Sequence, residues 1–277
     1  MNTQTALITG ASSGIGLHLA YEFARHGHPV VLVAPVESEL QNLAEDIQTR
    51  HGVTAHVIAK DLERPESAEA IYEEVQSMGM DIEILVNNAG HGFKGKWWEL
   101  PIEKDLSILR LNVEAVLRLT KLFLPPMVRR NRGRILNTAS VVGFEPSPLL
   151  TTYAASKAFV LSWSEALAVE LEDTQITVTA LCPGVTDTDF FAKAGAEGIQ
   201  GRQSSNVMAP QDVAKAGYNA MNDGELFVVP GGMNKAMIAA RRFLPVETQA
   251  KIHKKFNSEI PPEKQTHVRG EKEFARK

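Results

Sequence analysis

The 277-residue sequence contains a single cysteine, Cys182. One cysteine can form neither an internal disulfide nor a cysteine-rich zinc site, which excludes a disulfide-stabilised secreted scaffold and a zinc-finger protein. A protein without disulfides has no need of an oxidising compartment. We therefore expect an intracellular protein and predict a cytoplasmic location.

The sequence also lacks any apolar run close to the roughly 18 residues of a membrane-spanning helix. A strand-like run begins at Thr5, which leaves no room before it for the charged and apolar parts of a signal peptide. With 29 basic and 33 acidic residues the net charge is −4, so the surface as a whole has no excess of positive charge for nucleic acid. We expect a soluble protein, at most peripheral to a membrane, with no integral membrane segment and no nucleic-acid partner.

Short β-branched runs alternate with longer helical patterns along the chain. The predicted strands are nearly continuous apolar segments, as expected for strands covered on both faces. They are Ala6–Thr9, Val30–Ala34, Ala55–Ala59, Ile84–Asn87, Arg134–Ser140, Ile176–Leu181 and Leu226–Val229. The predicted helices are Gly14–His26, Glu37–Arg50, Pro65–Met78, Ile102–Arg130, Tyr153–Glu172 and Pro210–Asn222. Such alternation builds right-handed βαβ crossovers, so we predict a single α/β, Rossmann-type doubly wound parallel sheet of about seven strands with helices on both faces.

Two segments depart from this alternation. Residues 184–209 form a long connection with glycine and serine, which in a compact domain is more often a functional lid than a passive link. Residues 245–277 are polar and rich in lysine and arginine. We predict one catalytic domain over residues 1–244, including the lid, and a basic C-terminal tail over residues 245–277. The tail is either a solvated helix with a frayed end or a segment that binds a membrane surface or a partner.

A glycine-rich turn, Thr9–Gly16, joins the first predicted strand to the first predicted helix. Gly10, Gly14 and Gly16 allow a tight turn and let a pyrophosphate approach main-chain N–H groups at the positive end of the helix. The spacing is G-x-x-x-G-x-G rather than the commoner G-x-G-x-x-G, and glycine can also serve turn geometry alone. Its place in the first βα unit favours a dinucleotide site.

Further short motifs occur at the ends of predicted strands and in two predicted helices, along residues 6 to about 230. They are Asp61-Leu62, Asn87-Asn88-Ala89-Gly90, Asn112, Ser140, Tyr153 with Lys157, Pro183-Gly184 and Thr188. Together with the glycine turn, these features stand in the order typical of the classical short-chain dehydrogenases/reductases. The sequence resembles that family over most of its length.

The resemblance implies an oxidoreductase that exchanges a hydride between a nicotinamide dinucleotide and an alcohol or carbonyl substrate. It places Asp61 and Leu62 against the adenine, Thr188 against the nicotinamide amide, and Lys157 against the nicotinamide ribose. The full set of expected cofactor contacts is Gly10, Ser12, Ser13, Gly14, Ile15, Gly16, Asp61, Leu62, Asn88, Ala89, Gly90, Tyr153, Lys157, Pro183, Gly184, Val185 and Thr188.

Tyr153 and Lys157 lie four residues apart on a predicted helix, so they share one face. Ser140 stands at the carboxyl end of a predicted strand, the edge outside which open α/β sheets bind ligands. We predict that the three side chains converge beside the nicotinamide. An ammonium about 4 Å from the phenol, at an effective dielectric constant of about 20, supplies about 4 kcal/mol. Helped by the cationic nicotinamide of the oxidised cofactor, Lys157 is then sufficient to lower the tyrosine pKa from about 10 to about 7.

Tyr153 would then act as a general base toward an alcohol or, when protonated, as a general acid toward a carbonyl oxygen. Ser140 would donate a hydrogen bond to the substrate oxygen. Asn112 completes the predicted catalytic set. The resemblance implies that Asn112 helps to hold a water that links Lys157 to a proton relay, although an asparagine inside a helix can also simply cap or bend it.

The end of the second predicted strand, Ala34-Pro35-Val36-Glu37, bears on the choice of dinucleotide. An acidic residue at the strand end would accept from the 2′-hydroxyl of NAD and repel a 2′-phosphate, but Ala34 occupies that position. NADP users in the resembled family often place an arginine next, where this chain has Pro35. Ser12 and Ser13 could bond a phosphate, and Glu37 could oppose it. We favour NADP(H) over NAD(H).

Apolar residues near the predicted site favour an apolar ketone, aldehyde or secondary alcohol as substrate. The predicted substrate-binding residues are Ser140, Phe144, Tyr153 and Phe190, with Phe93, Leu149, Leu150 and Phe191 as further candidates. These apolar side chains could alternatively anchor loops, and Glu145 is the one nearby charge. His91 has no matching cluster of His, Asp or Glu, so no metal site is expected.

The predicted helices Ile102–Arg130 and Tyr153–Glu172 carry more apolar positions than one buried face requires, which favours a homodimer or homotetramer. Two other functions use a comparable glycine turn. A non-catalytic, dinucleotide-sensing regulator would not need the Tyr/Lys pair, and a methyltransferase explains neither that pair nor Asn87–Gly90. Catalytic hydride transfer is the preferred hypothesis, with the regulator as its alternative.

Overall fold

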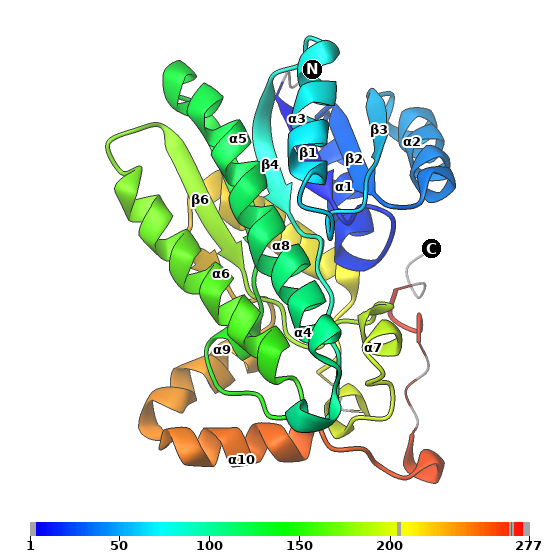
Figure 1. Ribbon diagram of the computed structural model, residues 1–277, viewed down its shortest axis with the longest axis vertical. Coiled ribbons are helices and arrows are strands. Elements are labelled where there is room, and N and C mark those ends of the chain that lie inside the picture. The colour runs from blue at the N-terminus through cyan, green and yellow to red at the C-terminus, as the bar shows by residue number, and fades with distance from the viewer. Residues whose placement is uncertain (1–3, 204–205, 266, 268, 274–277) are drawn as a thin grey trace.

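The computed structural model describes residues 4–203, 206–265, 267 and 269–273. Seven parallel strands form one sheet in the order β3-β2-β1-β4-β5-β6-β7 (Figure 1). Their bounds are β1 Thr5–Thr9, β2 Val30–Ala34, β3 Ala55–Ala59, β4 Ile82–Asn87, β5 Gly133–Thr138, β6 Ile176–Leu181 and β7 Phe227–Val228. The strand order reverses between β1 and β4, and a crevice outside the carboxyl ends of the strands at such a switch point is where doubly wound sheets bind ligands. The predicted fold is confirmed.

Helices cover both faces of the sheet (Figure 1). On one face Ile8 of β1 packs in a cluster with Phe23 of α1 and Tyr218 of α8, and on the other Leu7 of β1 packs in a cluster with Phe123 of α5. Leu7 and Ile8 are both fully buried although neighbours in a strand point to opposite faces, which is why the strand reads as a continuous apolar run. The helices of these two layers are α1 Gly14–Arg25, α2 Glu37–His51, α3 Ser67–Ser77, α5 Ala115–Arg130, α6 Thr151–Glu170 and α8 Pro210–Asp223.

The predicted helix Ile102–Arg130 is helical throughout but not uniform. α4 (Ile102–Leu109) is followed by a π-helical turn, Arg110–Glu114, and then by α5. A π turn accommodates an extra residue in the helix and often occurs at functional sites. Asn112 lies in this turn, and its side chain is fully buried.

The predicted strand Arg134–Ser140 ends earlier in the structure, where β5 stops at Thr138. Ser140 instead begins a 3₁₀ turn, Val141–Gly143, and its Oγ accepts a hydrogen bond from the Val142 N–H at 3.3 Å. Placing Ser140 inside the strand was therefore wrong, because its hydroxyl caps the following turn. The residue still lies at the carboxyl edge of the sheet.

The chain beyond β7 forms two helices, α9 (Gly232–Ala240) and α10 (Val246–Phe256), which lie past the carboxyl edge of the sheet (Figure 1). Asn257 anchors the end of α10, since its Nδ2 donates to Ser147 Oγ and to the Pro148 carbonyl, each at 2.8 Å. The domain boundary at residue 244 stays a prediction, and residues 266, 268 and 274–277 of the expected tail lie outside the described residues. Within the described ranges, no helix has the length and apolar character to cross a bilayer.

Candidate active site

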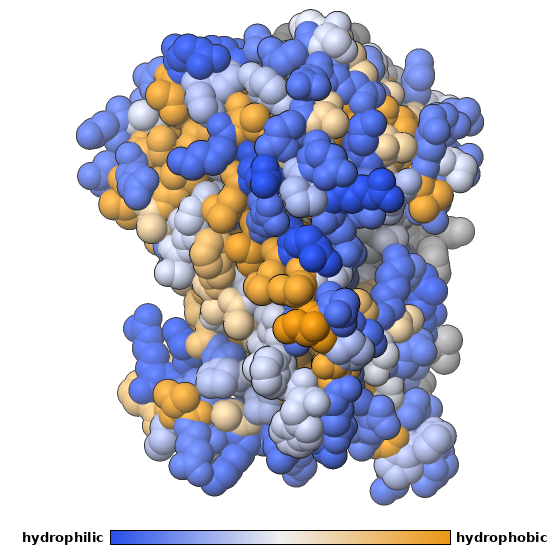
Figure 2. Space-filling view, in the orientation of Figure 1, coloured by the Kyte–Doolittle hydropathy of each residue, from blue (hydrophilic) through white to orange (hydrophobic). Residues whose placement is uncertain are grey.

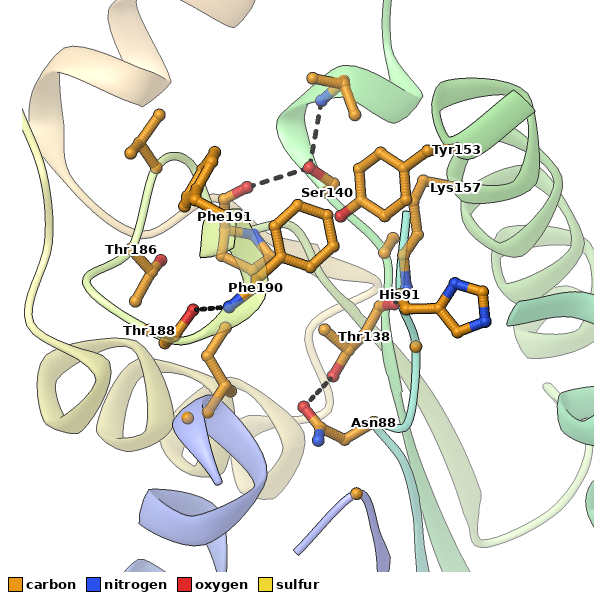
Figure 3. A pocket seen from close by; sticks show the side chains of 18 of the residues that line it. Asn88, His91, Thr138, Ser140, Tyr153, Lys157, Thr186, Thr188, Phe190 and Phe191 are labelled. Atoms are coloured by element: carbon orange, nitrogen blue, oxygen red, sulfur yellow. Dashed lines mark hydrogen bonds between the residues drawn. The ribbon is translucent and has the colours of Figure 1, made fainter. Parts of the chain in front are cut away.

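A cavity of about 650 Å³ opens along the carboxyl edge of the sheet. It extends from the glycine turn, past the ends of β2 and β3, to the ends of β4, β5 and β6, and its far wall comes from α9 and α10. Of the predicted cofactor contacts, only Gly16 does not line it. Figure 3 shows Ser140, Tyr153 and Lys157 close together, with the Phe190 ring beside Tyr153 and Thr188 farther away.

The glycine turn packs tightly against the motif that follows β4. Thr9 Oγ1 accepts from the N–H groups of Asn88 at 2.9 Å and Ala89 at 3.0 Å, and Asn88 Nδ2 donates to the Thr9 carbonyl at 3.0 Å. A Cβ on Gly16 would overlap the Gly10 carbonyl oxygen, which explains why Gly16 supports the turn without lining the cavity.

The first turn of α1 fits a dinucleotide pyrophosphate. Gly10 and Gly14 have φ values of +66° and +55°, a left-handed conformation that glycine adopts readily. Ser12, Ser13 and Gly14 line the cavity, and the side chain of Ser13, the residue that precedes α1, makes no capping hydrogen bond. The unsatisfied N–H groups at the positive end of a helix suit an anion, so these residues can hold the diphosphate of a nicotinamide dinucleotide.

Asn112 fixes the turn after β4 against α6. Its Oδ1 accepts from the His91 N–H at 3.0 Å, and its Nδ2 donates to the His91 carbonyl at 2.9 Å and to Ser156 Oγ at 3.0 Å. The imidazole of His91 also contacts Glu63 Oε1 at 3.1 Å, and burial lowers the pKa of His91. The Asn112 side chain therefore positions the segment that carries Gly90.

Ser140, Tyr153 and Lys157 meet as predicted. Tyr153 is hydrogen-bonded to Ser140, and its hydroxyl points into the cavity toward that residue (Figure 3). The Lys157 Nζ donates to the Thr138 carbonyl at 2.7 Å and lies 5.8 Å from the centre of the Tyr153 ring. The turn after β5 thus places the Ser140 hydroxyl beside the Tyr153 hydroxyl and the Lys157 ammonium, which both come from one face of α6.

The pKa of Tyr153 differs from the sequence prediction. Burial raises it to about 12, against a smaller lowering effect of the hydrogen bond with Ser140. Burial also lowers the pKa of Lys157 to about 8. Lys157 by itself does not lower the tyrosine pKa as expected, because the ammonium is directed at the Thr138 carbonyl and desolvation of the phenol dominates. At neutral pH Tyr153 is protonated and can donate its proton.

The predicted substrate-binding aromatics divide into two groups. Phe190 lines the cavity and its ring centre lies 4.9 Å from that of Tyr153, and Phe191 and Leu150 also line it. Phe144 is not among the lining residues and packs instead against Phe227, with ring centres 5.7 Å apart. The other two candidates, Phe93 and Leu149, likewise lie outside the lining.

The far wall of the cavity was missed by sequence reasoning. It includes Met237 of α9, Leu244 of the connecting segment, and Ile252 and Phe256 of α10. The spacing of Ile252 and Phe256, four residues apart, would have indicated a shared helix face, but not what that face contacts. Glu145, the one nearby charge, is paired with His253 Nε2 at 3.2 Å, so its carboxylate does not stand alone in the cavity.

The predicted lid, residues 184–209, is described except for residues 204–205 and includes α7 (Phe190–Lys193). Asp187 is fully buried in it and accepts from the N–H groups of Gly270 at 3.0 Å and Lys272 at 2.9 Å. Burial alone would raise the pKa of Asp187, but the hydrogen bonds from these backbone N–H groups outweigh it and lower the pKa. The C-terminal segment thereby fastens the lid next to Thr188.

We expect Asp187→Asn to reduce the free energy of unfolding by about 1–3 kcal/mol at neutral pH, because an amide cannot accept all of these hydrogen bonds. A carboxylate with a lowered native pKa contributes stability that is fully present above its unfolded value of 3.8 and is lost as the pH falls through the native value. Urea unfolding should therefore show a constant deficit from about pH 7 to about pH 5. Asp223→Asn, on an exposed helix end, is the matched control, and an equal loss in both variants contradicts the fastening role.

Comparison with known proteins agrees with this geometry. Residues 4–198 match the family model described as short chain dehydrogenase. A very-long-chain 3-oxoacyl-CoA reductase of Pyrenophora tritici-repentis is 41% identical over 171 residues, which make up 60% of this chain and 50% of that protein. A 17-beta-hydroxysteroid dehydrogenase type 3 of Rattus norvegicus is 38% identical over 182 residues, 65% of this chain and 59% of that protein. The chain thus spans about half the length of the curated relatives it matches.

Solved structures extend the similarity over more of the chain. A short-chain dehydrogenase from Sphingobium yanoikuyae in complex with NADPH superposes with a TM-score of 0.78 at 34% identity, covering 87% of this chain and 94% of that one. A 3-oxoacyl-[acyl-carrier protein] reductase with bound NAD from Brucella melitensis superposes with a TM-score of 0.70 at 26% identity, covering 82% and 87%. The two neighbours hold different dinucleotides, and both hold a nicotinamide cofactor.

Proposed function

The chain belongs to the short-chain dehydrogenase/reductase family, and on that premise we propose that it is an NADPH-dependent reductase of apolar ketones. One observation carries the proposal. The protonated hydroxyl of Tyr153 bonds Ser140 beside Lys157, in a cavity whose other half fits a dinucleotide. The complete Ser/Tyr/Lys arrangement gives no support to the alternative of a non-catalytic regulator.

The chain's residues account for the proton that the reduction requires. A bound reduced nicotinamide supplies hydride to the carbonyl carbon. Ser140 Oγ donates a hydrogen bond to the carbonyl oxygen and stabilises the negative charge that develops there. Tyr153, whose pKa is raised to about 12, gives its proton to that oxygen. A phenol that stays protonated at neutral pH favours reduction over oxidation.

Lys157 and Asn112 hold this arrangement in place. The Lys157 Nζ is fixed by the Thr138 carbonyl at 2.7 Å, and a Cβ on Gly90 would lie 3.3 Å from that Nζ and 3.1 Å from Asn112 Oδ1. Asn112 in turn fixes the backbone of His91. Residue 90 therefore has little room for a side chain between Lys157 and Asn112.

Two features of the adenosine end support NADPH as the preferred cofactor. Ala34 at the end of β2 presents no carboxylate to repel a 2′-phosphate. Lys60, directly after β3, lines the cavity, and its N–H donates to the Ala34 carbonyl at 3.1 Å, so the lysine is adjacent to the strand end that selects the cofactor. Its Nζ lies 4.0 Å from Glu74 Oε2, a loose ion pair that leaves the cation able to reach a phosphate.

Lys60→Ala is expected to weaken NADPH binding about fivefold, the value of one partly exposed ion pair, and to change NADH binding less than about twofold. Fluorescence titration of the wild type and the variant with both reduced cofactors measures this. Lys215→Ala, on an exposed part of α8, is the control and should leave both dissociation constants unchanged. An equal loss of affinity for NADPH and NADH in Lys60→Ala would show that Lys60 does not distinguish the two cofactors.

The substrate class follows from the apolar wall of the cavity. Met237, Leu244, Ile252 and Phe256 face a space where the Glu145 carboxylate is paired, an environment that disfavours small charged acids. The names of the two relatives describe enzymes of a very-long-chain 3-oxoacyl-CoA and of a hydroxysteroid, and the acyl chain of the first and the steroid of the second are apolar. We take a long-chain 3-oxoacyl thioester or a steroid ketone as the substrate class.

A panel of ketones with NADPH or NADH, followed by loss of nicotinamide absorbance, tests the proposed function. We expect turnover of the apolar ketones, faster with NADPH than with NADH. Absence of turnover across the panel, or turnover confined to small charged keto acids, would contradict it.

Assembly and location remain proposals of the same kind. Val128 of α5 and Phe159 and Val169 of α6 are 44%, 41% and 58% exposed, which supports a homodimer or homotetramer through these helices. The cytoplasmic location expected from the single cysteine is kept as a proposal.

A further inference from the structure

The corner between α9 and α10 exposes a group of large apolar side chains. We call this group the apolar corner, and its members are Met233, Met237, Phe243, Leu244, Val246 and Ile252, which are 56%, 38%, 87%, 40%, 63% and 53% exposed. Phe243 is the most exposed large apolar side chain in the part of the chain that the structure describes. Several large apolar side chains exposed on one part of a protein surface mark an interaction site.

Positive charge accompanies the apolar corner. Residues 232–258 contain six lysines and arginines and one glutamate, although the whole chain has a net charge of −4. Arg242, Lys254 and Lys255 are exposed, and the single glutamate, Glu247, is paired with Lys251 at 2.6 Å. Figure 2 shows the lobe of α9 and α10 at the lower end of the molecule, where apolar patches lie among hydrophilic side chains.

The apolar corner is continuous with the cavity. Met237, Leu244 and Ile252 are exposed to solvent and also line the cavity, so one apolar surface leads from the outside of the protein toward Tyr153. The corner is held to the body of the protein, because Arg241 Nη1 donates to the Phe144 carbonyl and His253 Nε2 of α10 is paired with Glu145 at 3.2 Å. It is thus a structured rim of the cavity.

We propose that the apolar corner docks on an anionic lipid bilayer. Its apolar side chains would enter the boundary between headgroups and acyl chains, while the surrounding lysines and arginines would contact acidic headgroups. α9 and α10 have 9 and 11 residues, lengths that suit helices lying on a membrane and not crossing it. A second copy of this chain is a poorer occupant, because face-to-face pairing would bring the same cations together.

The proposal that the apolar corner binds a bilayer does not depend on the enzyme's substrate, whereas the consequence for substrate entry rests on the proposed function. An apolar ketone dissolved in the bilayer could then enter the cavity along Met237, Leu244 and Ile252 without passing through water.

Co-sedimentation with vesicles tests the docking. The probes are vesicles of phosphatidylcholine alone and of phosphatidylcholine with about one third phosphatidylserine. We expect binding to the anionic vesicles at least about tenfold tighter than to the neutral ones, and weaker at high salt.

Phe243→Ser should reduce the partition coefficient about five- to tenfold. The double variant Arg242→Glu with Lys254→Glu should reduce it at least about tenfold.

Two matched substitutions on other parts of the surface serve as controls. Val169→Ser removes an exposed apolar side chain at the end of α6, and Arg50→Glu reverses an exposed charge on α2. Neither should change vesicle binding more than about twofold. Melting temperature and NADPH binding should be unchanged in all four variants, which shows that they are folded.

Three outcomes overturn the proposal. One is that the wild-type protein stays in the supernatant with anionic vesicles. Another is that Phe243→Ser binds as tightly as the wild type. The third is that vesicles capture nothing while Phe243→Ser abolishes a concentration-dependent dimer, which assigns the corner to self-association. Turnover of a water-soluble ketone without vesicles is measured separately, so failure of the proposed function is distinguishable from failure of docking.

Discussion

Turnover of an apolar ketone is expected to fall at least about a hundredfold in Tyr153→Phe, the low end of the effect of removing a general acid. The phenol is the proposed proton donor, and its raised pKa of about 12 keeps that proton available at neutral pH. NADPH affinity and the melting temperature should change little, because the ring of Phe would keep the contact with Phe190. Steady-state kinetics at saturating NADPH, a fluorescence titration and thermal unfolding measure the three quantities.

Tyr21→Phe is the matched control for this experiment. It removes a hydroxyl that bonds Asp46 at 2.7 Å on the far side of α1, outside the cavity. Activity within about twofold of the wild type is expected there. Full activity in Tyr153→Phe, or an equal loss in both variants, contradicts the assigned role.

Replacement of Lys157 by methionine is expected to abolish most activity and yet stabilise the cofactor-free protein. Lys157 is 4% exposed, and burial lowers its pKa from 10.5 to about 8. At neutral pH the folded protein must therefore hold a desolvated ammonium that the unfolded chain holds in water. One unit of pKa corresponds to about 1.4 kcal/mol, and methionine removes the cost of holding the buried charge. After the lost hydrogen bond to the Thr138 carbonyl is subtracted, we expect the free energy of unfolding to rise by about 1–3 kcal/mol.

The pH dependence of this gain follows from the direction of the pKa shift. The unfolded chain binds more protons than the folded protein between about pH 8 and 10.5, so the wild type becomes more stable as the pH rises through that window. The difference in free energy of unfolding between Lys157→Met and the wild type should therefore become smaller from about pH 8 to about pH 10.5. Urea unfolding at several pH values measures it, with Lys121→Met on the exposed side of α5 as the control. A less stable Lys157→Met, or a pH-independent difference, contradicts the cost assigned to the buried ammonium.

The central strands were predictable because burial on both faces of the sheet gives each of them a nearly continuous apolar run. The bounds of β2 and β6 agree with the prediction residue by residue, and so do those of β3, although most of its residues are only half-buried. The convergence of Ser140, Tyr153 and Lys157 was also predictable, because helix periodicity and the sheet edge bring them together.

Features that depend on distant contacts were not predictable. Asn112 lies in the π turn, and its side chain bonds His91 and Ser156, which come from other parts of the chain. The direction of the Tyr153 pKa depends on how much water its neighbours exclude, a quantity that residue spacing does not contain. For the same reason, the sequence indicated a polar tail from residue 245 where the structure has a cavity wall.

The position of Lys60 could have been found from the sequence. It stands directly after a predicted strand, one residue before Asp61, and carboxyl ends of neighbouring parallel strands meet at one edge. The prediction of cofactor choice used only the end of the second strand. Lys60 bears on that choice because β3 lies beside β2 in the sheet.

A structure of the protein with NADP⁺ and an apolar ketone bound together tests the central claim most directly. The account predicts the carbonyl oxygen within about 2.6–3.2 Å of both the Tyr153 hydroxyl and Ser140 Oγ, with the nicotinamide ring against the carbonyl carbon. A ketone bound in the cavity with its oxygen on another group, and with the Tyr153 hydroxyl out of hydrogen-bonding reach, would contradict it.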